Sequence, residues 1–323
     1  MADLATIFGG SGFVGAQIVR ALSRSGWRIR VAVRRPERGY KLPLLGDVGQ
    51  IQVVRADVRD RASVRAALEQ ASVCVNCVGI LFASPRQSFQ GAHVDGAAVV
   101  AEEAKAAGAR ALVHLSALGA DPASPSAYAR TKAAGEAAVR SALAEAVVLR
   151  PSIVFGAEDS FFNRFASMAM MSPALPLIGG GATRFQPVFV GDIARAVVTL
   201  LESEQRPPLL EVGGPATLSF RELMELVLRQ IGRRRLLVPV SFGAAMALGA
   251  AGDILAALAL PPPLTTDQVR LLRADNVVSG LAPGLEALGV TPTTLEAILP
   301  TYLWRYRRGG QYAGGGALRA GAR

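Results

Sequence analysis

Two residues with the spacing of an acid–base pair stand near the middle of the chain. Tyr128 and Lys132 begin and end the segment Tyr-Ala-Arg-Thr-Lys. In a helix this spacing places the phenol and the ammonium group on one face. Because a nearby Lys⁺ lowers the pKa of a phenol, we expect Tyr128 to act as a general acid or base. Lys132 can also bind the ribose of a nicotinamide nucleotide, so both residues are candidates for catalysis and for cofactor binding.

A glycine-rich segment near the start of the chain has the pattern of a phosphate-binding turn. It reads Gly-Gly-Ser-Gly-Phe-Val-Gly over residues 9–15, after an apolar run at 4–8 and before a helical pattern that ends near residue 25. In a strand–turn–helix unit, the free N–H groups of the helix N-terminus bind a pyrophosphate. The expected nucleotide contacts in this turn are Gly9, Gly12, Phe13, Val14 and Gly15.

The residues after the second expected strand favour NADPH (or NADP) over NADH. Arg34 and Arg35 stand where an NAD-specific site carries an acidic residue. The planar guanidinium group suits a 2′-phosphate because it forms paired, charge-assisted hydrogen bonds. Further contacts are expected after later strands, with Asp57 accepting from the adenine amino group. They are Asp57, Val58, Cys77, Val78, Gly79 and Ser116.

Strand-like and helix-like segments alternate through the first half of the chain. Short apolar strands are expected at 29–33, 51–54, 73–78, 111–115 and 146–149, and helices near 62–70, 96–107 and 128–144. This order predicts an α/β fold with a doubly wound parallel sheet of the Rossmann type. Proline and glycine predict a loop at 172–187, followed by strands at 188–190 and 209–212. Asp192 is the expected N-cap of a helix that reaches residue 201.

The chain is expected to contain two lobes. Residues 1–212 form the NADP(H)-binding Rossmann domain, with 156–187 contributing to a second lobe. Residues 213–308 form this smaller C-terminal α/β lobe, and 309–323 form a flexible tail rich in Gly, Ala and Arg. The apolar stretch 241–260 allows three interpretations: a packed helix, a helix facing a membrane or partner, or a span, against which Asp253 argues.

Composition restricts the partners. The chain has 323 residues and a net charge of +10, so its basic surface either meets an anionic membrane or an acidic protein, or is simply exposed to solvent. Nucleic acid is not expected because no basic stripe is interleaved with aromatic residues. Cys74 and Cys77 form Cys-x-x-Cys in a strand-like segment, where their thiols should face opposite sides. With only two histidines in the chain, no metal site is expected.

Taken together, these motifs resemble the short-chain dehydrogenase/reductase superfamily in its extended or atypical branch. The segments 128–136, 184–188, 264–272, 275–279 and 304–308 are similar to one group in it, the NAD(P)H-binding accessory subunits of respiratory complex I, NADH:ubiquinone oxidoreductase. The superfamily motif at 149–156 adds Pro151 and Ile153 as implied cofactor contacts. The resemblance implies a structural NADPH and core subunits of the peripheral arm as partners. It also implies a peripheral location on the inner side of the respiratory membrane, the bacterial cytoplasmic face or the mitochondrial matrix face.

One departure from the superfamily pattern weakens an enzymatic interpretation. Superfamily enzymes carry Ser or Thr one or two places into the turn after the fifth strand, where this chain has Ala117 and Leu118. Loss of such a polar group typically costs about 10²–10⁴-fold in rate. Two alternatives stay open beside the accessory subunit. One is an NADPH-dependent reductase, dehydrogenase or epimerase that uses Tyr128 and Lys132, and the other is a dinucleotide-binding redox sensor or RNA-handling protein.

Overall fold

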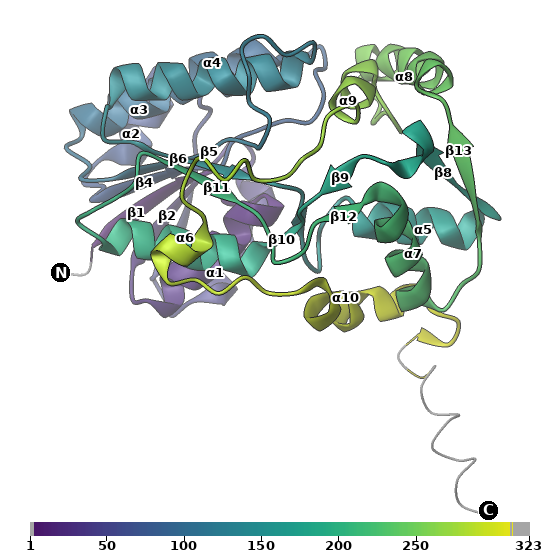
Figure 1. Cartoon of the computed structure of the whole chain (residues 1–323). Coiled ribbons are helices and arrows are strands. Elements are labelled where there is room, and N and C mark those ends of the chain that lie inside the picture. Colours follow the sequence, from purple (N-terminus) through teal and green to yellow (C-terminus); the bar gives the residue numbers. More distant parts are fainter. Residues whose placement is uncertain (1–2, 311, 313–323) are drawn as a thin grey trace, which may run out of the picture.

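A seven-stranded parallel sheet forms the first part of the molecule in the computed structural model, which describes residues 3–310 and 312 (Figure 1). The strands lie in the order β11-β6-β5-β4-β1-β2-β3. Strand order reverses beside β1, which confirms the predicted doubly wound Rossmann fold. The strands are β1 (Leu4–Phe8), β2 (Arg28–Val33), β3 (Ile51–Arg55), β4 (Val73–Asn76), β5 (Leu112–Leu115), β6 (Val147–Pro151) and β11 (Leu209–Val212).

Helices cover both faces of this sheet. On one face α1 (Phe13–Arg24) packs against α6 (Val190–Glu202), and on the other lie α2 (Arg61–Leu68), α3 (Gly96–Ala106) and α4 (Ala127–Ala142) (Figure 1). Successive strand residues alternate between the two cores, as Ile7 and Phe8 do in β1. The nearly continuous apolar strands of the sequence are therefore explained by burial on both sides.

The two cysteines are free thiols in or just after β4. Cys74 is buried within β4, Cys77 follows the strand, and both thiols are free. Burial raises the pKa of the Cys77 thiol to about 12 and that of Cys74 further. Within residues 3–310 and 312, no group of three His, Cys, Asp or Glu side chains is placed to hold a metal ion.

A second core lies beside the sheet and draws on residues from 155 to 303. Its helices are α5 (Phe162–Met171), α7 (Phe220–Ile231) and α10 (Leu295–Leu303), and its aromatic side chains include Phe161, Phe185 and Phe220. The segment 155–189 contributes to this core together with residues beyond 218. The predicted lobe boundary at residue 213 stays a prediction.

The predicted loop at 172–187 is wrong. It contains β8 (Ala174–Ile178), which pairs in parallel with β13 (Leu236–Val240), and β9 (Arg184–Phe185), which pairs with β12 (Leu218–Ser219). Pairing with strands more than 30 residues away satisfies backbone groups that local proline and glycine signals cannot reveal. Pro176 is tolerated in a two-stranded sheet because one edge of each strand needs no donor.

The prediction that Asp192 is the N-cap of α6 is wrong. The helix begins at Val190, directly after β10 (Val188–Phe189), which pairs with β7 (Val154–Phe155). Asp192 lies in the first turn, fully buried, and accepts hydrogen bonds from Arg195 and from the amide and hydroxyl of Thr293. The carboxylate thus binds a segment about 100 residues further along the chain, and the local sequence around Asp192 carries no signal of this contact.

The apolar stretch 241–260 forms α8 (Phe242–Ala257), whose N-cap is Ser241. Small residues on its inner side let it lie close to the start of α9 (Thr266–Leu271), and a Cβ on Gly252 would lie 1.7 Å from the Leu264 carbonyl oxygen. Asp253 accepts a hydrogen bond from the Thr266 hydroxyl at 2.6 Å. In the part of the chain that the structure describes, no helix combines the length and apolar character needed to cross a membrane.

Candidate dinucleotide site

The glycine turn has the geometry of a phosphate cradle between β1 and α1. Gly9 has φ +76°, which favours glycine, and a Cβ on Gly15 would lie 2.4 Å from the Gly9 carbonyl oxygen. Gly12 is the N-cap of α1 and provides no side-chain cap. The first N–H groups of the helix, at Phe13 and Val14, have no acceptor within the helix and are therefore the groups that an anion at this turn would bind.

The loop after β4 lies directly against this turn. A Cβ on Gly9 would come within 3.1–3.2 Å of the backbone of Cys77 and Val78. The Cys77 amide donates to the Phe8 carbonyl, and the Val78 amide to the Asn76 side chain. Two of the predicted contacts, Cys77 and Val78, thus meet the phosphate turn at the point where the strand order reverses, where nucleotides bind in such sheets.

Lys132 connects this loop to the end of β5. Its buried Nζ donates to the Leu115 carbonyl at 3.1 Å, and a Cβ on Gly79 would lie 3.3 Å from Nζ. Burial lowers the pKa of Lys132 to about 8, against the attraction of Glu136. The structure thus brings Gly79, Leu115 and Lys132 together beside the turn.

Tyr128 lies on the same helix face as Lys132, as the spacing predicts, but its chemistry differs from the prediction. Burial raises the pKa of Tyr128 to about 12, whereas we expected Lys132 to lower it. The Lys132 Nζ lies 6.0 Å from the centre of the Tyr128 ring and is bound to a backbone carbonyl instead. The expectation was wrong because loss of solvation outweighs a charge that is directed elsewhere.

Ser116 supplies a polar atom that has no partner in the described part of the chain. Its side chain is buried just beyond β5, and its Oγ makes no hydrogen bond there. A buried hydroxyl normally has a partner, and leaving it without one costs about 1–3 kcal/mol. This orphaned atom, together with the backbone geometry of the glycine turn, fits a bound dinucleotide.

The predicted adenosine end of the site is exposed and strongly charged. Arg34 and Arg35 follow β2 directly, and the Arg34 guanidinium donates to Gln87 at 3.0 Å. Asp57 accepts three hydrogen bonds from Arg59, two from its guanidinium and one from its backbone amide, and they keep the pKa of Asp57 below the usual range. Its carboxylate can accept from an adenine amino group only in competition with this arginine.

The remaining predicted contacts lie on either side of the crevice. The side chain of Val58 is buried against Gly96, so only its backbone is free to meet a nucleotide. Pro151 ends β6, and its carbonyl accepts from the Leu118 amide at 3.0 Å. The Ile153 amide donates to the Asn276 side chain, which also accepts from the Ser152 hydroxyl at 2.8 Å.

Sequence reasoning missed three residues at this site. The Asp267 carboxylate accepts from the Ser126 hydroxyl and from the amides of Ala127 and Tyr128, at 2.7–3.1 Å, and so fixes the start of α4. Asn276 holds the backbone just after β6 through its hydrogen bonds with Ser152 and Ile153. Both lie in segments that carried the family resemblance without an assigned role, and no local pattern marks them.

His93 is the third missed residue, and it lies on a π-helix, Gln90–Asp95, that runs into α3. Its Nε2 accepts from the Ile80 amide at 3.1 Å, and its Nδ1 lies 3.0 Å from the Thr131 hydroxyl. Its ring packs edge-on against Tyr128. Single π-helical turns often mark functional sites, but the chain's helical pattern does not distinguish one from an α-helix.

Comparisons with known proteins identify the family. The model of the NAD dependent epimerase/dehydratase family matches residues 5–213. The mitochondrial NADH dehydrogenase [ubiquinone] 1 alpha subcomplex subunit 9 of Arabidopsis thaliana is 35% identical over 318 residues, which cover 95% of this chain and 79% of the relative. The chain belongs to this family and to its group of complex I subunits. It is thus an extended member of the short-chain dehydrogenase/reductase superfamily, as the motifs predicted.

One further relative and one solved structure of similar fold carry the names of enzymes. The ceramide reductase of Caulobacter vibrioides is 35% identical over 192 residues, covering 59% of each protein. A solved structure of an NADPH-dependent quinone oxidoreductase of Escherichia coli with NADPH has a TM-score of 0.71 and 20% identity, covering 93% of this chain and 98% of the other. The family and these folds support a nicotinamide dinucleotide as the ligand class.

Proposed function

We propose that this protein is an accessory subunit of NADH:ubiquinone oxidoreductase, complex I, and that it binds NADPH as a structural, non-catalytic cofactor near the membrane. The observation that carries the proposal is the 35% identity to a complex I subunit along 95% of the chain. Its partners would be core subunits of the peripheral arm. Its location would be peripheral, on the inner side of the respiratory membrane.

The site itself supports a nucleotide that is held and not turned over. Ala117 and Leu118 supply no hydroxyl to polarise a substrate carbonyl, and burial, which raises the pKa of Tyr128 to about 12, makes its phenol a weaker proton donor than an ordinary tyrosine. When bound, a reduced nicotinamide supplies a hydride donor. Lys132 would bind its ribose, the turn at 9–15 its pyrophosphate, and Arg34 and Arg35 its 2′-phosphate.

A bound nucleotide would stabilise the fold. A ligand that binds only the folded chain adds RT ln(1 + [L]/Kd), about 2.7 kcal/mol at a hundredfold excess over Kd. It would also offer the Ser116 hydroxyl a partner. This gain explains why a subunit outside the electron path would keep a complete phosphate cradle.

Native purification tests the proposal. A tagged chain is expressed in its own organism, membranes are solubilised in mild detergent, and the chains that co-purify are identified. We expect the core subunits of the quinone reductase in a constant ratio to the tagged chain. Recovery of the chain only as a free protein, away from membranes, would refute the assignment.

A second candidate, an NADPH-dependent reductase, is favoured by the similarity to a ceramide reductase and by the presence of Tyr128 and Lys132. In that reaction the Tyr128 hydroxyl would donate a proton to the substrate carbonyl oxygen, with Lys132 holding the ribose. Steady oxidation of NADPH with a carbonyl substrate, lost in Tyr128→Phe, would establish it. Inertness towards long-chain keto lipids and a broad carbonyl panel would count against it.

A further inference from the structure

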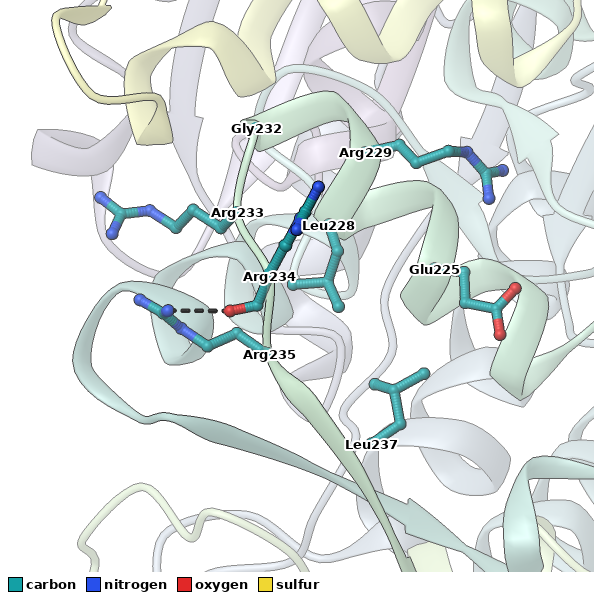
Figure 2. Close-up of a pocket in the computed structure, with 8 residues that line it drawn as sticks. All are labelled: Glu225, Leu228, Arg229, Gly232, Arg233, Arg234, Arg235 and Leu237. Carbon is teal, nitrogen blue, oxygen red and sulfur yellow. Dashed lines mark hydrogen bonds between the residues drawn. The ribbon is translucent and has the colours of Figure 1, made fainter.

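A basic hollow lies in the second core region, far along the chain from the dinucleotide turn. It is formed where α7 ends at Gly232 and β13 begins, and has a volume of about 610 Å³. Figure 2 shows four arginines and a single carboxylate, Glu225, around it. The arginines are Arg229, Arg233, Arg234 and Arg235.

The charges of these arginines are not neutralised within the described part of the chain. None of the four forms an ion pair there. Arg233 donates to the Tyr306 carbonyl and Arg235 to the Ala169 carbonyl, so these two guanidinium groups are held in place. Arg229 and Arg234 are exposed. One arginine suffices to offset the negative end of the α7 dipole, and the other three charges need a different explanation.

An apolar surface continues from the hollow along β13. Leu236 and Val238 lie on the outer side of the strand, with 71% and 43% of their surfaces exposed, whereas Leu237, which lines the hollow, lies on the other side. The strand is about 17 Å long and leads directly to Ser241, the N-cap of α8. Figure 1 shows β13 along the outer edge of the elements that surround the second core, with α8 at one end of the strand.

The outer face of α8 carries no charge. Its single ionisable side chain, Asp253, is turned inward to Thr266. Leu248 and Ile254 are 61% and 64% exposed, and the residues between them on this face are alanines. A helix that is apolar all round is normally buried, so its exposed side is expected to have a covering.

We propose that this edge, from the arginine hollow along β13 to α8, binds the surface of an anionic phospholipid bilayer. The arginines would bind lipid phosphates, and the outer side chains of α8 would enter the interface between headgroups and acyl chains. The combination of basic and uncharged apolar surface favours lipid over an acidic protein, whose recognition needs the arginines alone. This inference rests on the proposed location beside a membrane and assigns the residues that would contact it.

Vesicle flotation of the full chain with NADPH tests this inference. Vesicles of phosphatidylcholine are compared with vesicles in which about a third of the lipid is phosphatidylglycerol, a fraction that gives a negative surface potential. We expect binding to the anionic vesicles that weakens with salt. Absence of binding to them would overturn the proposal.

Charge reversal locates the surface. Arg229→Glu with Arg234→Glu is expected to reduce binding to anionic vesicles by at least about tenfold. The matched control is Arg20→Glu with Arg24→Glu on α1, which changes the net charge equally at two exposed positions outside the hollow. If both double variants lose binding alike, the effect is one of net charge and the assigned hollow is wrong.

The apolar part is tested by Leu248→Ser with Ile254→Ser on α8. We expect weaker vesicle binding even at low salt, and unchanged binding would show that α8 does not enter the lipid.

NADPH binding and co-purification with complex I are measured for every variant. Loss of vesicle binding with co-purification retained supports the lipid surface. Normal vesicle binding with co-purification lost in Arg229→Glu/Arg234→Glu means that an acidic protein occupies the hollow, which overturns this inference alone.

Discussion

At the scale of single residues, burial beside a lysine keeps two histidines neutral. Lys132 lies near two buried histidines, His93 and His114, each about 1% exposed. Burial first, and the nearby Lys132 charge second, lower the pKa of both histidines to about 3. Both rings are therefore neutral at physiological pH, and His93 can accept the Ile80 amide that helps to shape the crevice.

These histidines predict a dependence of stability on pH. Because their pKa values lie below that of an unfolded histidine, the unfolded chain binds more protons as pH falls below about 6.5. Their stabilising contribution is complete above about pH 6.5 and declines towards pH 3. Between pH 7.5 and 5.0 we expect the free energy of unfolding to fall by about 2 kcal/mol for each histidine.

Urea unfolding at these two pH values measures the effect. The variant His93→Asn/His114→Asn should be less stable at pH 7.5 and should lose most of the pH dependence, since these are the only histidines in the chain. Equal unfolding free energies for the unaltered chain at both pH values would contradict the neutral, buried state of the rings.

Arg34 and Arg35 carry the prediction of nucleotide preference. Replacing both with alanine removes the paired donors for a 2′-phosphate, and charged hydrogen bonds contribute about 1.5–3 kcal/mol each. We expect the NADPH affinity to fall by at least about tenfold, with little change for NADH, in isothermal titration. Arg24→Ala is the control. A parallel loss for both nucleotides would mean that these arginines do not read the phosphate.

At the scale of elements, the close approach of α1 to the strand–turn segment defines the cradle. A methyl group on Gly15 would meet the Gly9 carbonyl oxygen at 2.4 Å, so the turn would have to move. A similar approach joins α4 to the π-helix, because a Cβ on Gly135 would lie 2.0 Å from the His93 carbonyl oxygen. Because neither glycine has a side chain, the two backbones can touch at each place. These contacts position the turn at 9–15 and the helix that carries Tyr128 and Lys132.

Gly15→Ala should therefore disrupt nucleotide binding. We expect the NADPH affinity to fall by more than about tenfold and the free energy of unfolding by about 1–3 kcal/mol, the usual cost of overpacking. Gly243→Ala in α8 is the matched control, since its new methyl would lie 3.9 Å from the Ser241 hydroxyl and touch nothing closer. Normal NADPH binding by Gly15→Ala would show that the turn is not the cradle.

Sequence reasoning found the elements whose signals are local. The apolar strands, the glycine turn and the face shared by Tyr128 and Lys132 follow from periodicity and spacing, and the structure has them. It failed where distant segments act together. The pairing of β8 with β13, the use of Asp192 by Thr293 and the capping of α4 by Asp267 each join residues about 60 or more apart. Burial, which raised the pKa of Tyr128, is likewise a property of the folded chain.

At the scale of the whole molecule, the segment 276–293 runs between the seven-stranded sheet and the second core. Asn276 binds Ser152 and Ile153 just after β6, and Thr293 binds Asp192 at the start of α6. Between them, the Ser279 amide donates to Glu211 in β11. A nucleotide bound beside β6 would thus stabilise the same part of the sheet that these C-terminal hydrogen bonds hold in place.

The most direct test of the central claim is the state of the bound nucleotide during turnover. The assembly that contains this chain is purified from membranes, allowed to oxidise NADH with a quinone, then denatured, and the released nucleotides are quantified. We predict about one NADPH for each copy of this chain, still reduced after many turnovers. Release of oxidised NADP in step with turnover, or of no NADP(H) at all, would contradict a structural NADPH.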